Sequence, residues 1–217
     1  GETDWRDVVA FDALPQRAGK DVRRLVNANN PVTGLAYPYF LGVDWAPPYR
    51  AARIHTLLDE GRGRTIQDAA AMQRDLFSGM VHDLLPIMIG AKPNSVAGQR
   101  AIALLRNWDG VMAPERAEPL IFNAWLLALN RALYGDELGT QWGDYLGGRP
   151  MTVKSMLTQR QAWCDNVKTE SVETCEKILA QSLDIAVAVL IERHGAKLDD
   201  WRWGEAHMAH FPHPVLT

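Results

Sequence analysis

Apolar side chains recur every three or four positions through most of the chain, the spacing that places them on one face of a helix. The first such segment follows Pro48, a residue well suited to the first turn of a helix. The last and longest runs from Val172 to His194, and Gly195 directly after it suits the position that ends a helix. The pattern predicts helices over residues 48–58, 65–84, 96–108, 118–133, 151–164 and 172–194.

Local signals mark several ends of these helices. Thr65-Ile66-Gln67-Asp68 has the form of a capping box, in which the threonine and the acidic side chain each bond a backbone amide of the first turn. Pro86 is expected to kink or end the helix that this box starts. Glu118-Pro119 opens another helix. Its apolar face is expected to carry Leu120, Ala124, Leu127 and Leu133.

The two ends of the chain lack this period. Residues 1–20 are expected to form an extended surface segment, residues 22–28 a short strand and residues 29–48 a long loop. A loop of that length inside a compact domain is usually functional. The predicted fold class is therefore mainly α with short β edges (α+β). We expect a single domain over 1–217, made of an extended or loop segment with a short strand (1–47), a helical block (48–195) and an extended tail (196–217).

Composition excludes some classes of partner. Of the 217 residues, 47% are hydrophobic and 8 are tryptophans, enough to bury a substantial core. The formal net charge is −3 and there is no basic run, so we expect neither nucleic acid nor an anionic membrane surface as a partner. No apolar stretch approaches the roughly 18 residues that a membrane-spanning helix needs.

Chemistry is suggested most strongly by the segment Leu25–Pro31, where a short apolar stretch ends in the adjacent amides Asn29 and Asn30. Further along, Ala46-Pro47-Pro48-Tyr49 delivers Arg50 at the start of a helix. Asparagine amides are uncharged donors, which suits them to stabilise a developing oxyanion without a pKa shift. Asn-Asn-Pro is also ordinary turn chemistry, because asparagine bonds its own backbone and proline presets φ. On this segment alone the turn is the commoner interpretation.

Three histidines near the end of the chain invite a metal hypothesis. His207, His210 and His213 recur every third position, as zinc ligands on a helix can. Pro212 and Pro214 break any helix across the third histidine, so we predict no metal site in this chain.

The chain has 2 cysteines, Cys164 and Cys175, which flank a polar stretch rich in Asp, Asn, Lys, Thr and Glu. Such a pair can be a disulfide that clips a corner between helices, or two unrelated buried thiols.

Many short pieces of the chain occur in an order that is far more specific than any one of them. The pieces are Asp4-Trp5-Arg6, Phe11-Asp12-Ala13-Leu14-Pro15, Asn27-Ala28-Asn29-Asn30, Tyr37-Pro38-Tyr39-Phe40-Leu41-Gly42, Tyr49-Arg50-Ala51-Ala52-Arg53-Ile54, Gln73-Arg74-Asp75, Trp108-Asp109-Gly110, Ile121-Phe122-Asn123-Ala124-Trp125, Trp163-Cys164-Asp165, Glu173-Thr174-Cys175, Trp203-Gly204-Glu205-Ala206-His207 and Phe211-Pro212-His213-Pro214. In this order the chain resembles, nearly end to end, the penicillin amidase (penicillin acylase) family of N-terminal nucleophile hydrolases.

The resemblance implies a helical segment of a four-layer αββα enzyme, whose nucleophile is a serine exposed by self-cleavage. The chain begins with Gly1, and its internal serines lack the family's processing motif. We therefore expect an internal segment of the β chain that lacks the nucleophile serine and is inactive alone. Its implied partners are the remainder of the acylase (the α chain and the rest of the β chain) and a small-molecule amide substrate. A periplasmic or secreted location is also implied, and with it a disulfide between Cys164 and Cys175.

The resemblance also assigns roles to individual residues. Asn29 matches the family asparagine whose side-chain amide helps to hold the oxyanion, with Asn30 as the alternative if the register slips by one. Asn27 is expected to anchor the turn. Arg50 matches the family arginine that lies close to this asparagine and orients the site, although Arg53 sits on nearly the same helix face.

Aromatic residues of the long loop are expected to contact substrate. Tyr37, Phe40 and Trp45, together with Tyr39, can line an acyl pocket or simply pack the loop down. Family members often hold a structural calcium ion, and Asp44 lies in the corresponding loop. A single carboxylate is far short of the six to eight oxygens that calcium takes, so no cofactor is expected in this segment and a calcium ion only in the full enzyme.

The implied function is an amidohydrolase that cleaves a linear amide, a penicillin-type side chain or a related N-acyl compound, through a serine acyl-enzyme. This segment would supply oxyanion and orienting residues. The enzymatic alternative is an acyl-homoserine lactone acylase of the quorum-quenching kind. The alternative from another class is a non-catalytic helical binding module, which would not need a mature parent chain that starts with serine.

Overall fold

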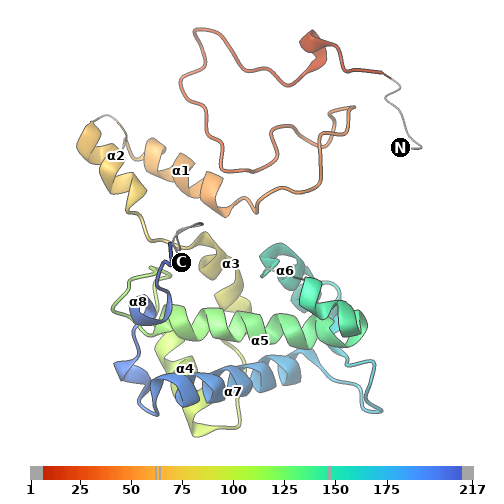
Figure 1. Ribbon diagram of the computed structural model, residues 1–217, viewed down its shortest axis with the longest axis vertical. Coiled ribbons are helices and arrows are strands. Elements are labelled where there is room, and N and C mark those ends of the chain that lie inside the picture. Colours follow the sequence, from red (N-terminus) through yellow and green to blue (C-terminus); the bar gives the residue numbers. More distant parts are fainter. Residues whose placement is uncertain (1–6, 62, 64, 146–147, 212–217) are drawn as a thin grey trace. The chain divides into compact units, whose positions relative to one another are not determined.

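The helical pattern predicted from the sequence is confirmed by the computed structural model, which describes residues 7–61, 63, 65–145 and 148–211 (Figure 1). The chain divides into two compact units, Gly1–Asp75 and Leu76–Thr217. The first contains the 3-10 helix η1 (Phe11–Ala13), α1 (Tyr49–Asp59) and α2 (Ile66–Gln73). The second contains α3 (Gly79–Met88), α4 (Val96–Arg106), α5 (Glu118–Leu138), η2 (Gly139–Asp144), α6 (Pro150–Thr158), η3 (Gln161–Cys164), α7 (Cys175–His194), η4 (Leu198–Asp200) and α8 (Trp203–Ala206). A single domain over the whole chain stays a prediction.

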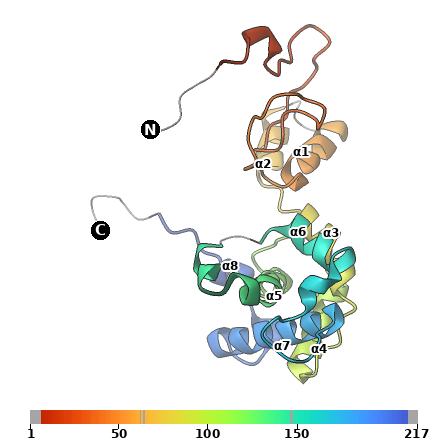
Figure 2. The same cartoon turned by 90° about the vertical axis from the view of Figure 1, so that its right-hand side faces the viewer.

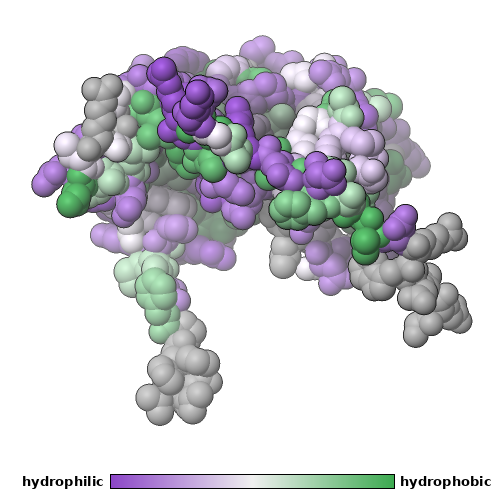
Figure 3. All heavy atoms as spheres, turned by 90° about the horizontal axis from the view of Figure 1, so that it is seen from above, coloured by the Kyte–Doolittle hydropathy of each residue, from purple (hydrophilic) through white to green (hydrophobic). Residues whose placement is uncertain are grey.

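In the first unit, α1 and α2 lie side by side (Figure 1, Figure 2). α2 begins with the predicted capping box: Thr65 Oγ1 accepts from the Asp68 amide at 3.0 Å, and the Asp68 carboxylate accepts from the Thr65 amide at 3.1 Å. Few apolar side chains are buried here, since α1 buries only Ala51 and Leu57 and α2 buries none. Many apolar side chains of the protein lie instead at the surface among polar ones (Figure 3).

The second unit is organised around α5 and α7, which run antiparallel and side by side (Figure 1). Trp125 of α5 is fully buried, and its indole Nε1 donates to the carbonyl of Leu179 and to Oγ of Ser182, each at 3.1 Å. Trp201 is also buried, and its Nε1 donates to the carbonyl of Gly195 at 2.9 Å. Large indoles can fill this core because their polar edges are satisfied. Within the described ranges, no helix is both long and apolar enough to cross a membrane.

The prediction of a strand over residues 22–28 is wrong. Residues 22–27 carry no strand or turn assignment, and none of the described residues forms a ladder with them. The isolated bridge that the described residues do contain joins Phe77 and Val111. A strand needs a partner to bond its amides and carbonyls, and this segment finds none here. Among the residues that the structure describes, the fold is therefore mainly α, without the β edge expected at residues 22–28.

The helix predicted over residues 65–84 is in fact two helices. α2 stops and α3 starts again several residues later because the intervening backbone bonds to another segment. The carbonyl of Leu76 accepts from the Met112 amide at 2.8 Å, and the Ser78 amide donates to the carbonyl of Gly110 at 2.9 Å. These tertiary hydrogen bonds replace the intrahelical ones that the apolar period predicted.

The predicted and observed helices also differ in smaller ways. The segment 151–164 forms α6 and η3 rather than one helix, and the tail 196–217 contains η4 and α8 within its described part. Pro86 lies inside α3, which ends soon after it, as expected. Leu120 and Leu133 of the predicted apolar face are buried, whereas Leu127 is 64% exposed because the buried face of α5 runs through Trp125, Leu126 and Leu129.

Cys164 and Cys175 form a disulfide, which confirms the pairing implied by the resemblance. It closes the corner that leads into α7. In the chain-entropy model, a crosslink over this sequence separation of 11 stabilises a protein by about 2–3 kcal/mol.

We expect the double variant Cys164→Ala/Cys175→Ala to lose about 2–3 kcal/mol of unfolding free energy in a urea titration. Dithiothreitol should destabilise the wild-type chain and leave the double variant unchanged. Equal stability of the two chains without reductant would contradict a stabilising role for the crosslink.

Glu173 organises the polar loop inside this corner. Its buried carboxylate accepts from the Asn166 amide at 3.1 Å, from Thr169 Oγ1 at 3.0 Å and from Ser171 Oγ at 2.9 Å. These donors, the Asn166 amide first among them, lower the pKa of Glu173 to about 2. Hydrogen bonds that favour the charged carboxylate are the physical cause.

The lowered pKa of Glu173 gives stability a defined pH dependence. Because the folded pKa of about 2 lies below the ordinary value of 4.5, the stabilisation is present above pH 4.5 and is lost as pH falls toward 2. We expect the thermal midpoint of the wild-type chain to fall more steeply across this window than that of Glu173→Gln. Parallel curves for the two chains would show that Glu173 is not the responsible group.

Candidate functional site

The turn that follows residues 22–26 is held by its own asparagines. Asn27 Oδ1 accepts from the Asn29 amide at 2.8 Å, and Asn30 Oδ1 accepts from the Ala28 amide at 3.1 Å. Ala28 is buried, whereas Asn27 and Asn29 are exposed. The amides of Ala28 and Asn29 are thus already bonded, so neither is available to an anion. Asn27 anchors the turn, as predicted, and Asn30 shares this work.

Asn29 itself has an unusual backbone conformation. Its φ is +62°, in the left-handed region that few residues other than glycine enter. Asparagine tolerates this region better than most residues. Its carbonyl accepts from the Ala46 amide at 2.7 Å, which closes the loop between the turn and α1.

Arg50, in the first turn of α1, binds this turn directly. Its Nη2 donates to the carbonyl of Ala28 at 2.8 Å and to Oδ1 of Asn29 at 2.7 Å. The structure therefore brings together the two residues that the resemblance singled out, although they lie 21 positions apart. A guanidinium contains only donors, so it fixes the oxygen of the Asn29 amide toward itself. The Nδ2 donors of Asn29 have no partner among the described residues and remain open to a ligand.

Arg53, the other arginine on this face, has a different partner. Its Nε donates to Asp75 Oδ2 at 2.8 Å and its Nη2 donates to Asp75 Oδ1 at 2.7 Å. This hydrogen bond is the main cause that raises the pKa of Arg53 above its ordinary value. The sequence left Arg50 and Arg53 hard to separate, and the structure separates them by their acceptors.

The pairing of Asp75 with Arg53 was not predicted from the sequence. The Asp75 carboxylate receives two donors from one guanidinium, a pairing that the local sequence does not predict. The sequence contains a signal for Asp75 itself, because Gln73-Arg74-Asp75 is one of the ordered pieces that carry the resemblance. Nothing in that piece names Arg53 as the partner.

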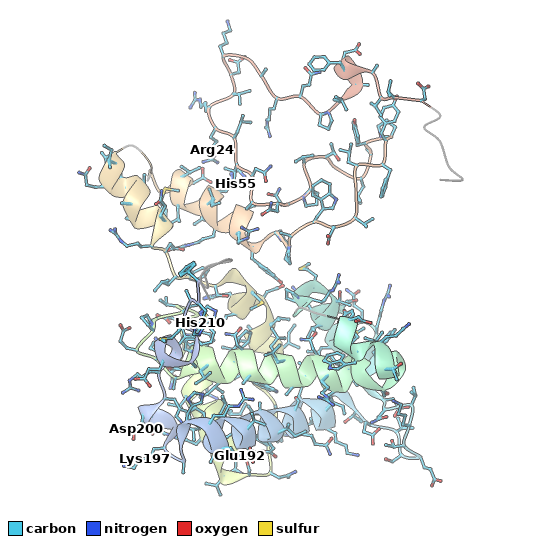
Figure 4. The ribbon with its side chains drawn as sticks, viewed as in Figure 1. Arg24, His55, Glu192, Lys197, Asp200 and His210 are labelled. Carbon is cyan, nitrogen blue, oxygen red and sulfur yellow. A yellow bond between two sulfur atoms is a disulfide. The ribbon has the colours of Figure 1, made fainter. Side chains whose placement is uncertain are left out.

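A cavity of about 500 Å³ adjoins the turn within the first unit. Its lining includes Arg17, Arg24 and His55 together with Asn27 and Asn30, and Arg24 and His55 lie near one another (Figure 4). The cavity therefore presents cationic and amide groups over apolar walls. No sequence pattern predicts this cavity, because its lining comes from separated parts of the chain.

Within this unit Arg24 is also paired with a carboxylate. Its Nη1 lies 2.6 Å from Asp59 Oδ1, near the end of α1, and this contact is the main cause that lowers the pKa of Asp59. Both side chains are well exposed, at 37% and 64%, so this pair contributes little to stability.

The predicted substrate-contacting aromatics lie on the loop that this turn begins. Tyr37 donates its hydroxyl to the carbonyl of Ala13 at 2.8 Å, and Trp45 Nε1 donates to the carbonyl of Gly42 at 3.0 Å. Phe40 is 81% exposed. Tyr37 and Trp45 are thus each fixed by a hydrogen bond to a backbone carbonyl, and none of the three lines the cavity beside the turn. Their contact with substrate stays a prediction.

Metal ligands do not converge in the part of the chain that the structure describes, which holds no group of three or more His, Cys, Asp or Glu side chains placed to bind an ion. His207 instead stacks on Trp203, with ring centroids 4.3 Å apart and planes at 9°. His210 follows α8 in the tail (Figure 4), and His213 lies outside the described residues.

The arrangement at Asn29 is that of an amide donor polarised by a neighbouring cation, at the end of an extended segment. The family profile described as Penicillin amidase matches residues 1–217. The chain therefore belongs to the penicillin amidase family.

Curated relatives extend this assignment. The chain is 28% identical over 221 residues to the Penicillin acylase 2 proenzyme of Pseudomonas sp. (strain SE83), which covers 99% of this chain and 28% of that protein. It is 26% identical over 241 residues to the acyl-homoserine lactone acylase QuiP of Pseudomonas putida, which covers 99% of this chain and 29% of that protein. The QuiP acylase of Pseudomonas aeruginosa is 25% identical over 232 residues, with 95% and 27% covered. The chain thus spans less than a third of the length of these relatives.

Loss of the Arg50 guanidinium should loosen the turn that carries Asn29. Hydrogen bonds to charged groups are worth about 1.5–3 kcal/mol, so in Arg50→Ala the Ala46 amide should exchange its hydrogen at least about ten-fold faster. Native-state hydrogen exchange with mass spectrometric or NMR detection measures this.

The matched control is Arg100→Ala, which removes an arginine bonded to Asp199 in the other unit. This variant should leave exchange at Ala46 unchanged. Equal exchange rates in wild type and Arg50→Ala would show that Arg50 does not hold the turn.

Proposed function

We propose that this chain is a segment of the nucleophile-bearing β chain of an enzyme that hydrolyses linear amides through a serine acyl-enzyme. The observation that carries the proposal is the hydrogen bond between Arg50 Nη2 and Asn29 Oδ1, which leaves Nδ2 of Asn29 open. In this proposal the segment belongs to a four-layer αββα enzyme, and the serine lies outside residues 1–217.

The chemistry assigned to this segment is stabilisation of the oxyanion. The serine oxygen attacks the amide carbonyl, and the carbonyl oxygen becomes an oxyanion to which Nδ2 of Asn29 donates. Collapse of this intermediate expels the amine, which takes up a proton, and leaves the acyl group on the serine. Water then attacks the acyl-enzyme through a second oxyanion at the same donor, and the carboxylic acid leaves as the serine is regenerated.

Arg50 would support both steps without touching the reacting atoms. Its guanidinium holds the oxygen of the Asn29 amide, so the amide cannot flip and present an acceptor to the oxyanion. Its positive charge also increases the polarity of the Nδ2–H bonds. A donor already held in this orientation needs no reorganisation when the charge develops.

The relatives support two substrate classes, since one is named a penicillin acylase and others acyl-homoserine lactone acylases. We place the penicillin-type or related N-acyl amide first and the acyl-homoserine lactone second. Export to the periplasm or beyond belongs to the same proposal, and the disulfide supports it because such crosslinks persist in oxidising compartments. A structural calcium ion, if the full enzyme holds one, would need ligands from outside this chain.

In the full-length parent enzyme, Asn29→Gly should lower kcat for phenylacetanilide hydrolysis about 10²–10³-fold, the usual effect of losing one oxyanion donor. Glycine accommodates the φ of +62°, so the variant removes the amide without straining the turn. Asn107→Ala, which truncates an exposed asparagine in the other unit, is the matched control and should keep full activity.

The same preparation tests the nucleophile. Mass spectrometry should find a mature subunit that begins with serine, and a serine-to-alanine change there should abolish hydrolysis. Parallel assays with a penicillin and an acyl-homoserine lactone would rank the two substrate classes. An unprocessed chain without hydrolysis, or an Asn29→Gly enzyme with unchanged kcat, would contradict the proposal.

A further inference from the structure

We propose that Asp75 is a positioning residue for the oxyanion site: by holding the guanidinium of Arg53, it fixes the helix face from which Arg50 reaches Asn29. This inference rests on the function proposed above. Asp75 bonds the guanidinium of Arg53, so it would act through α1 and not on the substrate.

The contact between Asp75 and Arg53 is strong for its surroundings. Both carboxylate oxygens accept from the same guanidinium, at 2.8 Å and 2.7 Å, the parallel arrangement that gives the strongest and most directional pairs. The side chains are 26% and 19% exposed, so solvent screens the pair less than a fully exposed one. The pair links α1 to the residues just after α2.

α1 depends on such links because it buries few apolar side chains. The helix buries only Ala51 and Leu57, and its N-terminal cap residue, Pro48, makes no side-chain capping bond. α2 buries no residue at all. A helix with so small an apolar contact is marginal on its own, and its position is set by its polar contacts.

Three polar contacts link α1 to other segments at different points along the helix. Arg50 bonds the asparagine turn, Arg53 bonds Asp75, and Asp59 pairs with the exposed Arg24. The last pair is too exposed to fix the helix. Arg50 and Arg53 are three residues apart and so share one face. Anchoring Arg53 therefore sets the rotation of α1, and with it the direction of Arg50.

Displacement of α1 would have a characteristic effect on kcat and KM. If α1 rotates or shifts, Arg50 loses its geometry toward Oδ1 of Asn29, and the Asn29 amide is no longer held for the transition state. Substrate binding by other parts of the pocket is unaffected. Loss of Asp75 should therefore lower kcat and leave KM nearly unchanged.

The test is a double-mutant cycle in the full-length parent enzyme, with wild type, Arg50→Ala, Asp75→Asn and the double variant assayed on phenylacetanilide. Active sites are counted with a serine-reactive sulfonyl fluoride, so kcat refers to folded enzyme only. We expect Asp75→Asn to lower kcat by about 10-fold or more, the scale of a small misplacement of a catalytic group, with KM changed less than about two-fold. In the Arg50→Ala background the same change should have less than about a two-fold effect on kcat.

Two further variants separate positioning from general damage. Asp59→Asn removes a carboxylate from the same helix and breaks its exposed pair, and it should keep kcat within about two-fold of wild type. Arg53→Lys replaces the fork with a single ammonium and should lower kcat as Asp75→Asn does. It also serves as the test if Asp75→Asn yields no folded enzyme.

The outcomes distinguish this inference from the proposed function. If Arg50→Ala and Asn29→Gly leave kcat unchanged, the proposed oxyanion site is wrong and this inference falls with it. If both lower kcat but Asp75→Asn and Arg53→Lys do not, only the positioning role is overturned. Equal losses from Asp75→Asn with and without Arg50 would also overturn it, because the two residues would then act independently.

Discussion

The candidate site in the first unit depends on the hydrogen bonds that the guanidinium of Arg50 donates. This guanidinium bonds the carbonyl of Ala28 and the side chain of Asn29 across 22 and 21 positions of sequence. No large apolar core backs these bonds, because the helix that carries Arg50 buries only two side chains. The orientation of the Asn29 amide is therefore set by a polar contact of one helix face, while the turn and the loop closure at Ala46 have hydrogen bonds of their own.

The second unit follows a different physical principle. α5 and α7 bury a continuous apolar face, and the indoles of Trp125 and Trp201 lie within it with their polar edges bonded. Hydrophobic burial is not directional, so this unit gains most of its stability from area and packing. Directed hydrogen bonds, which the first unit relies on, are what a catalytic donor needs.

Membership in the penicillin amidase family sets this chain beside much longer relatives. The chain spans 28% of the length of its penicillin acylase relative and 29% of one acyl-homoserine lactone acylase relative. The extended residues before the turn have no strand partner among the described residues, and many apolar side chains of this unit are exposed. Both features fit a segment whose neighbours lie in the rest of a larger protein.

The sequence by itself determined most of the helical segments, the capping box at Thr65 and the identity of Asn29 and Arg50 as candidates. Helical period and capping are local properties, set by residues within a few positions of one another. Tertiary structure alone decided that residues 65–84 form two helices, that Arg53 belongs to Asp75, and that the free donor of Asn29 is Nδ2. Each of these depends on atoms brought together from distant positions, where hydrogen bonds to another segment override the local preference.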